Sequence, residues 1–302
     1  MTAIHGLGSP VAGVFGNESG LSTVKYVVAG GGSFEIIDNP RVSMAISTEK
    51  KAAGRWDDLK VSPVKLGMTS SGFEIAFRPN RWSVCRGFLR AMEEYDDVWK
   101  AGRPVEKGSW VHFRGPGILG VHAVVLASVE YGQNGRISKA HAVLARRDPL
   151  RVSFNPGCWS LSFEEQIDLV QSVPEQPAEA TGRGLREEFD TALGSFKLLG
   201  GVFEPRTGNL GLVTVSIFDI PIEDLVGTAQ RLGSRGENDL VVGMPLESPF
   251  IEQLRRERCF STELANQCVG TRKAIPPGGL HPTTLARLEL VTGLLIDQKE
   301  KI

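Results

Sequence analysis

Short apolar runs separated by turn residues characterise the chain from Val24 to about Phe77. The runs KYVVAGGG, SFEIIDNP, VSMAIS and GFEIAF are each bounded by Gly, Asn, Pro or Ser. This alternation predicts a small antiparallel β region. From Trp82 to Trp99 the apolar residues recur near helical spacing, which predicts an amphipathic helix. The turn-rich segment 101–109 (AGRPVEKGS) is a candidate boundary.

The pattern becomes more regular after this segment. GVHAVVLASVEY and KAHAVLARR are typical of two strands, and the residues GQNG at 132–135 between them predict a hairpin. CWSLSF, GLVTVSIFDIP and DLVVGMPL are further β-like runs, whereas a helix is expected at about 178–193. Two helices are predicted to close the chain, at 250–258 and 282–295, the second with Pro282 in its first turn. Strands around a few helices indicate an α+β or α/β sandwich.

These patterns divide the chain into three segments. Residues 1–20 are rich in Gly and Ser and are expected to form a poorly ordered lead-in. Residues 21–105 are expected to form a β-rich N-terminal region with a helix near 82–99. Residues 106–302 are expected to form a second, larger domain.

Composition and charge exclude several classes of protein. The 302 residues include 34 basic and 35 acidic side chains, and this balance argues against broad binding to nucleic acid or to anionic lipid. The apolar runs are far shorter than the roughly 20 residues that cross a bilayer, and no secretory signal is visible. The four cysteines lack the spacing of a zinc site and are expected to be reduced in a cytoplasmic protein. The oligomeric state stays open, a homodimer included.

The segment PEQPAEATGRGLREEFDTALG, residues 174–194, carries the candidate chemistry. On a helix, four of its residues form an inward stripe: Thr181, Leu185, Phe189 and Ala192. Glu187 and Glu188 are adjacent carboxylates that repel each other, so they favour a cation between them unless water screens them. A hard divalent ion with oxygen ligands is the natural candidate.

Two glycines in this helix are unusual. Gly182 and Gly184 each cost about 1 kcal/mol relative to Ala in a helix interior, which suggests that a strand or a ligand approaches the backbone closely. The alternative interpretation is a solvated amphipathic helix with an ordinary surface pair between Arg183 and Glu187.

The segment resembles a degenerate Nudix box, whose pattern is Gly, five residues, Glu, seven residues, then Arg-Glu-apolar-any-Glu-Glu. Two positions depart from it, since Leu169 stands at the first Gly and Gly184 replaces the Glu after the Arg. HAVLARRD and NPGCWSLSFEEQ resemble the strands and loop before the box, and GLVTVSIFDIP and ENDLVVGMPLES those after it. The resemblance covers roughly residues 115–295. It implies an α+β fold, a Nudix-like α/β/α sandwich with a mixed sheet.

The resemblance also implies a metal site and the residues that form it. In the family, this helix binds Mg²⁺ or Mn²⁺, which neutralises phosphate charge and activates water. Glu187 and Glu188 would be catalytic metal ligands, with Arg183 holding a carboxylate in place. Glu175 would support the site, and Glu237 would be an extra ligand or base. At the place left by Gly184, either Glu164 or Glu165 supplies a carboxylate, or the site binds metal weakly or is not catalytic.

Several other side chains are candidates for substrate binding. Arg114, Arg146 and Arg147 offer planar donors that suit phosphate, although solvated strand ends are the usual role of such arginines. Trp159 would supply a wall for stacking a base, with core packing as its alternative role.

Two functions from different classes follow. The first is a metal-dependent hydrolase that cleaves the pyrophosphate bond of a nucleoside diphosphate linked to another group. The second is a catalytically weak or inactive module that senses a nucleotide, with the N-terminal region as an interaction unit. A scaffold for protein contacts is a third, simpler possibility. The sequence leaves the substrate open because the fold does not determine it.

Overall fold

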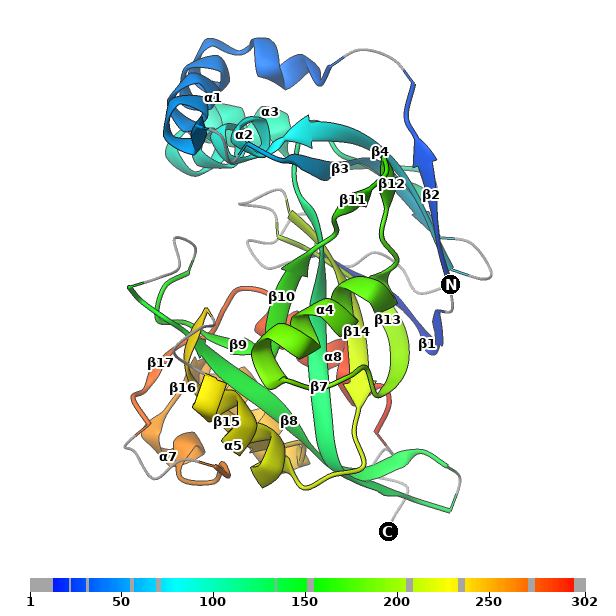
Figure 1. Cartoon of the computed structure of the whole chain (residues 1–302), viewed down its shortest axis with the longest axis vertical. Coiled ribbons are helices and arrows are strands. Elements are labelled where there is room, and N and C mark those ends of the chain that lie inside the picture. The colour runs from blue at the N-terminus through cyan, green and yellow to red at the C-terminus, as the bar shows by residue number, and fades with distance from the viewer. Residues whose placement is uncertain are drawn as a thin grey trace. The chain divides into compact units, whose positions relative to one another are not determined.

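The computed structural model describes residues 13–21, 23–30, 33–54, 57–68, 72–133, 135–150, 155–204, 209–232, 237–270 and 275–295 (Figure 1). The chain divides into two compact units. Unit 1 comprises Met1–Val121, Gln166–Ala180 and Gly200–Leu212, and unit 2 comprises His122–Glu165, Thr181–Leu199 and Val213–Ile302. Unit 1 therefore includes two segments that lie well beyond the turn-rich segment 101–109.

Unit 1 contains a five-stranded sheet with the order β2-β4-β3-β6-β5. The strands are β2 (Thr23–Val28), β3 (Leu59–Met68), β4 (Gly72–Arg81), β5 (Val105–Lys107) and β6 (Trp110–His112). The unit also contains η1 (Glu35–Asp38), α1 (Pro40–Ala53), α2 (Trp82–Glu94) and α3 (Asp96–Gly102). β3 is antiparallel to β4 and to β6, but β2 runs parallel to β4, so the expectation of a purely antiparallel region is wrong there.

The run VSMAIS was predicted to be a strand and is instead part of helix α1. The Asn39 side chain accepts a hydrogen bond from the Arg41 backbone N–H, and Pro40 occupies the first turn, so the residues before the run begin a helix. Val42, Ala45 and Glu49 are buried, at the spacing of one helix face. The burial of this helix face stabilises the helix more than the β propensity of the run favours a strand.

Near the N-terminus, strand β1 (Gly13–Leu21) pairs with β13. Residues 1–12 lie outside the described residues.

The second sheet has eight strands, in the order β1-β13-β14-β7-β8-β15, with β10 paired to β7 and β9 to β8. Its remaining strands are β7 (Leu119–Tyr131), β8 (Ile137–Arg147), β9 (Trp159–Leu161), β10 (Phe163–Gln166), β13 (Ser195–Glu204), β14 (Asn209–Ile217) and β15 (Asn238–Pro245). β7 and β8 form the predicted antiparallel hairpin, which the Gly132 N–H closes by donating to the Arg136 carbonyl.

Helices and short strands complete the fold. The helices are α4 (Pro177–Phe189), α5 (Ile222–Leu232), α6 (Ser248–Glu257), α7 (Thr262–Ala265) and α8 (Thr284–Thr292). The short strands are β11 (Leu169–Val170), β12 (Val173–Pro174), β16 (Cys259–Phe260) and β17 (Gly278–Gly279). The predicted helices at 178–193, 250–258 and 282–295 correspond to α4, α6 and α8.

The core of unit 2 lies between the sheet and two helices. Leu185 and Phe189 of α4 pack with buried residues of β7, β8 and β15 and with the apolar face of α5. That face consists of Ile222, Leu225, Val226 and Ala229, at the i, i+3, i+4, i+7 spacing of an amphipathic helix. Helix α5 was not predicted from the sequence, although the apolar spacing of these four residues is visible there.

The fold class is α+β, as predicted, with mixed strand directions and helices interleaved along the chain. Within the described part of the chain, no helix combines the length and apolar character that a membrane span requires.

Candidate functional site

Helix α4 carries the box-like segment and has identifiable signals at both ends. The Gln176 N–H donates to the Glu179 carboxylate at 2.7 Å, and Pro177 follows in the first turn. Asp190, with φ 49°, takes the left-handed conformation that ends the helix. Thr181, Leu185 and Phe189 are buried, as the inward stripe predicts. Ala192 lies beyond the helix end and is exposed, so its inclusion in the stripe is wrong.

Gly184 is a contact point between α4 and strand β10. A Cβ atom at this position would lie 2.3 Å from Cε2 of Phe163, whose ring occupies the space. The predicted close approach at this glycine is thus made by a core side chain. A glutamate, which the box pattern has here, could not be accommodated unless this ring moved. A Cβ atom at Gly182, by contrast, would make ordinary contacts, at 3.6 Å to Arg186 and 3.8 Å to Leu193.

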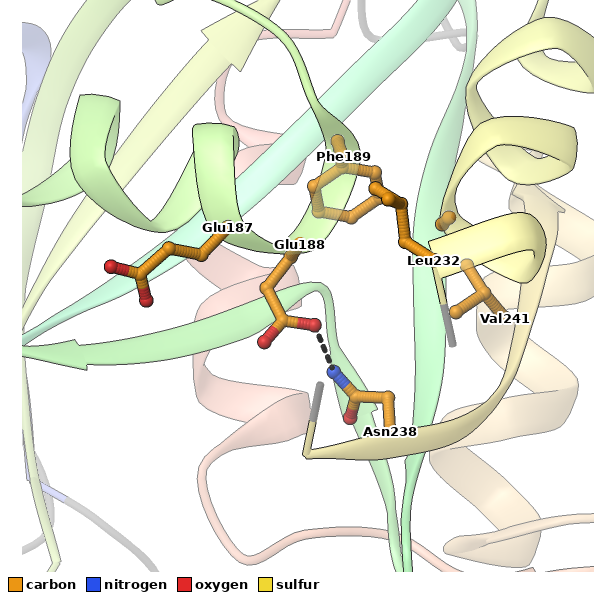
Figure 2. Close-up of a pocket in the computed structure, with 7 residues that line it drawn as sticks. Glu187, Glu188, Phe189, Leu232, Asn238 and Val241 are labelled. Atoms are coloured by element: carbon orange, nitrogen blue, oxygen red, sulfur yellow. Dashed lines mark hydrogen bonds between the residues drawn. The ribbon is translucent and has the colours of Figure 1, made fainter. Parts of the chain in front are cut away.

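The two adjacent glutamates of α4 have different surroundings. Glu188 accepts a hydrogen bond from the Asn238 side chain at 3.3 Å and is partly buried. Glu187 is exposed, and its carboxylate is directed away from that of Glu188 (Figure 2). The prediction that both carboxylates turn toward one ion is therefore not met in this arrangement.

Glu188 and Asn238 lie at the boundary between two small hollows. The first, here called the site pocket, is polar and is lined by Arg147, Ser160, Ser162, Phe163, Glu164, Glu188, Glu237 and Asn238. The second, here called the apolar hollow, is lined by Glu187, Glu188, Phe189, Ala229, Leu232, Asn238 and Val241 (Figure 2). Strands β8, β9 and β10, helix α4 and the start of β15 thus bring together residues that are far apart in sequence.

Arg147 lies between two carboxylates of the site pocket. Its Nη1 is 3.5 Å from Oε2 of Glu164, and its Nη2 is 3.4 Å from Oε2 of Glu237. Arg147 is directly opposite Asn238 in the pairing of β8 with β15, so both side chains project from the same face of the sheet. The pairing therefore places the guanidinium group beside the Glu188–Asn238 contact.

Glu164 also binds a buried cation from helix α8. Its Oε1 accepts a short hydrogen bond from Arg287, whose side chain is fully buried. Burial by itself would raise the pKa of Glu164, but interactions with His281 and then with Arg287 lower it, so that it lies well below its usual value. Glu164 is therefore an ionised residue that already has cationic partners. The suggestion that it supplies the carboxylate missing at position 184 is not supported by these contacts.

The carboxyl group of Glu188 has a pKa above its ordinary value of 4.5. Burial is the main cause, and the negative charges of Glu237 and Glu187 add to it. Hydrogen bonds from the Asn238 side chain and the Glu237 backbone act in the opposite direction. Glu188 is thus a carboxylate whose charge is incompletely compensated.

The other predicted site residues lie elsewhere. Glu165 forms an ion pair with Arg183 at 2.7 Å. Glu175 belongs to unit 1, where its carboxylate accepts a hydrogen bond from the Asp168 N–H at 3.3 Å. Two of the five predicted metal ligands, Glu188 and Glu237, line the site pocket.

Three of the four predicted substrate-binding residues are not part of the site pocket. Arg114 is exposed in unit 1, and Arg146 pairs with Asp239 at 2.9 Å. Trp159 is fully buried, where its ring packs on Phe260 and its Nε1–H donates to the Pro276 carbonyl. This burial contradicts a base-stacking role for Trp159, because a ligand could reach the ring only if the core opened.

The donor set of the site pocket suits a divalent cation only in part. Glu188 and Glu237 offer hard oxygen ligands and a negative charge that needs compensation. Among the described residues, however, no three His, Cys, Asp or Glu side chains are grouped so as to hold a metal ion. A bound cation would therefore be held by Glu188 and Glu237, with water or a ligand completing its coordination.

Two residues of this region, Asn238 and Arg287, were not among the site residues predicted from the sequence. Arg287 had a visible signal, because it is the one charged residue in the run TTLARL that enters helix α8. A charge in an apolar helix stretch indicates a buried pair. Asn238 had no such signal, since its role follows from its pairing opposite Arg147.

Comparisons with known proteins extend these observations only slightly. Neither the protein-family models nor the curated proteins include a match to the chain. Among solved structures, the chain is similar to the Nudix domain of Shewanella oneidensis NrtR complexed with ADP ribose. The identity is 15% and the TM-score 0.34, over 58% of this chain and 85% of that one.

Two further solved structures are similar to this chain. The first is a mutT/nudix family protein from Listeria innocua, at 15% identity and a TM-score of 0.38, over 59% of this chain and 93% of the other. The second is DR0079 from Deinococcus radiodurans, at 20% identity and a TM-score of 0.25, over 35% of this chain and 58% of the other. Two of the three structures are thus described as Nudix domains or Nudix family members. Because every TM-score is below 0.5, the function proposed below rests on the residues of the site.

Substitution of the two helix glycines by alanine is expected to have opposite effects on stability. Gly182→Ala should stabilise the protein by about 0.5–1 kcal/mol, because it removes the helix cost of glycine without a clash. Gly184→Ala should destabilise it by about 1–3 kcal/mol, since the added methyl group overlaps the Phe163 ring. Urea unfolding of both variants measures the difference. Equal effects of the two substitutions would contradict the assigned contact.

The raised pKa of Glu188 predicts a pH-dependent effect of Glu188→Gln. The folded protein favours protonated Glu188, so this contribution to stability is present below the ordinary pKa and is lost as the pH rises through the folded-state pKa. The uncharged variant should therefore melt on the order of 2 °C above the parent at pH 8 and show no such gain near pH 4. Thermal unfolding with EDTA present measures this, and a parent that melts higher at pH 8 would contradict it.

Proposed function

We propose that the protein is a Nudix-like hydrolase that depends on a divalent cation and cleaves the pyrophosphate bond of a nucleoside diphosphate linked to another group. The observation that carries this proposal is the meeting of Glu188 and Glu237 in one polar pocket, with Glu188 incompletely compensated. A carboxyl group whose pKa is raised by burial and by neighbouring charges in a pocket is a candidate for a functional site.

The charge balance of the pocket supports a cation as the first ligand. Arg147 and Arg287 pair with Glu164 and Glu237, and the carboxylate of Glu188 then leaves one net negative charge when all three glutamates are ionised. This net negative charge would repel a phosphate, whereas a bound divalent cation would make the net charge positive. Cation binding would thus prepare the site for a phosphate.

Each pocket residue then has a separate role. A bound divalent cation supplies charge neutralisation and lowers the pKa of water. Glu188 and Glu237 would hold the cation from two different segments of the chain. Asn238 fixes the orientation of the Glu188 carboxylate through its hydrogen bond, and Arg147 would contact a phosphate oxygen with its planar donors.

The apolar hollow beside the site pocket supports a nucleotide rather than free phosphate as the ligand. Phe189, Leu232 and Val241 give it an apolar wall, and it shares Glu188 and Asn238 with the site pocket. A ligand with one charged and one apolar end fits such a pair of surfaces.

The test is hydrolysis of a panel of ADP-ribose, dinucleotides and nucleoside triphosphates, with Mg²⁺ or Mn²⁺ and with EDTA. Turnover is expected only with a divalent cation, and Glu188→Gln should lower kcat about 100-fold. Because Glu187 does not line the site pocket and its carboxylate is directed away from that of Glu188 (Figure 2), Glu187→Gln should lower kcat less than about fivefold. Glu252→Gln, an exposed carboxylate on α6, is the matched control and should retain the parent rate. Lack of turnover with every substrate, or equal activity of the Glu188 variant, would refute the hydrolase.

A specific observation favours the second candidate, a nucleotide-sensing module. The Phe163 ring fills the space where the box pattern places the Glu that follows its Arg, so the helix offers fewer cation ligands than the pattern requires. This candidate predicts that nucleotides bind and raise the melting temperature without being hydrolysed. Calorimetry together with product analysis separates the two functions, and a nucleotide that neither binds nor shifts the melting temperature would refute the sensor.

A further inference from the structure

Arg287 is a fully buried arginine that does not line the site pocket, and its two terminal nitrogens, Nη1 and Nη2, have well-defined partners. Nη1 donates to the Leu161 carbonyl at 2.9 Å and to Oγ of Ser160 at 3.3 Å. Nη2 donates to Oγ1 of Thr283 at 2.6 Å and to the Glu164 carboxylate. Helix α8 therefore holds a cation in the protein interior in a single orientation.

This cation is the first member of a continuous series of charges that leads into the site pocket. Arg287 binds Oε1 of Glu164, and Oε2 of Glu164 faces Nη1 of Arg147. The Nη2 atom of Arg147 in turn faces Glu237, whose charge raises the pKa of Glu188. Positive and negative charges thus alternate from Arg287 of α8 through Glu164 and Arg147 to Glu237, and Glu188 of α4 is a second negative charge beside Glu237.

Arg287 does not line the site pocket, whereas Arg147 does. The Arg287 side chain is 0% exposed, but that of Arg147 is 12% exposed at the pocket wall. A long arginine side chain loses rotamer freedom when a ligand fixes it. Contacts that hold it in place beforehand reduce this cost of binding.

We propose that Arg287 and Glu164 are positioning residues, which fix the Arg147 guanidinium group in the site pocket as the group that binds a phosphate of the ligand. His281 does not replace Arg287 in this role. Burial lowers the pKa of His281 to about 4, so its ring is neutral at pH 7, and its Nδ1 accepts a hydrogen bond from the Thr283 N–H. The proposal rests on the proposed function only in its ligand class, a pyrophosphate, and requires no hydrolysis.

A purely structural role for Arg287 makes a different prediction. If the buried pair served only to stabilise unit 2, its loss would lower the melting temperature but leave ligand affinity unchanged in the folded variant. A positioning role requires that affinity falls and that the loss depends on Arg147.

The experiment is calorimetric titration of the full chain with inorganic pyrophosphate in the presence of Mg²⁺. Arg147→Gln is expected to raise the Kd about tenfold, and Arg287→Gln about fivefold. Arg287→Lys keeps the charge and should recover part of the affinity. Arg256→Gln, on α6 and 76% exposed, removes a positive charge away from the pocket and should leave the Kd within about twofold.

The double variant separates positioning from an independent effect. If Arg287 acts through Arg147, then Arg147→Gln combined with Arg287→Gln should bind no more weakly than Arg147→Gln alone. Losses that multiply would show that Arg287 affects binding by another route and would overturn the proposal.

Because Arg287→Gln leaves Glu164 without its buried partner, this variant can fail to fold. In that case Thr283→Val tests the positioning role, because it removes the 2.6 Å hydrogen bond from Arg287 and nearly preserves the side-chain volume. It is expected to raise the Kd about twofold to threefold, again only while Arg147 is present. An unchanged Kd in folded Thr283→Val, or no pyrophosphate binding by the parent, would overturn the proposal. Pyrophosphate binding that depends on both arginines without turnover of any nucleotide would instead refute only the hydrolase.

Discussion

The close contact between helix α4 and strand β10 is the constraint on which the candidate site depends. Gly184 has no side chain, so the Phe163 ring packs directly against the helix backbone. This contact sets the distance at which Glu188, four residues later on the same helix face, meets Asn238 and Glu237. A larger residue at 184 would separate the helix from the strand and with it the carboxylates of the pocket.

The same contact explains why the box-like segment differs from the family pattern that it resembles. A glutamate at position 184 and an aromatic ring at position 163 exclude each other, because both need the same space. The chain has the aromatic ring, which contributes to the core with Phe189 at a centroid distance of 6.0 Å. The Phe163 ring thus adds to core packing at position 184, where the family pattern has a metal ligand and this chain has Gly.

Most of the charged groups around the pocket are arranged in ion pairs. Charges removed from water are stable only when they are paired and hydrogen-bonded. Each cation here has a carboxylate partner. Arg287 pairs with Glu164, Arg147 with Glu164 and Glu237, and Arg183 with Glu165. Glu188 is the exception, with an amide and a backbone N–H as its hydrogen-bond partners in place of a cation. Among the described charged residues around the pocket, Glu188 is therefore the carboxylate whose charge is not compensated by a cation.

The sequence by itself determined the elements whose periodicity is local. The hairpin of β7 and β8, the α4 helix with its buried stripe, and the helices near 250–258 and 282–295 follow from spacing and turn residues alone. Only the tertiary structure decided which charged side chains meet. Arg147 and Asn238 are 91 positions apart and become neighbours through strand pairing, and Arg287 reaches Glu164 across 123 positions. Such contacts depend on the register and packing of distant segments, which a local pattern of residues does not encode.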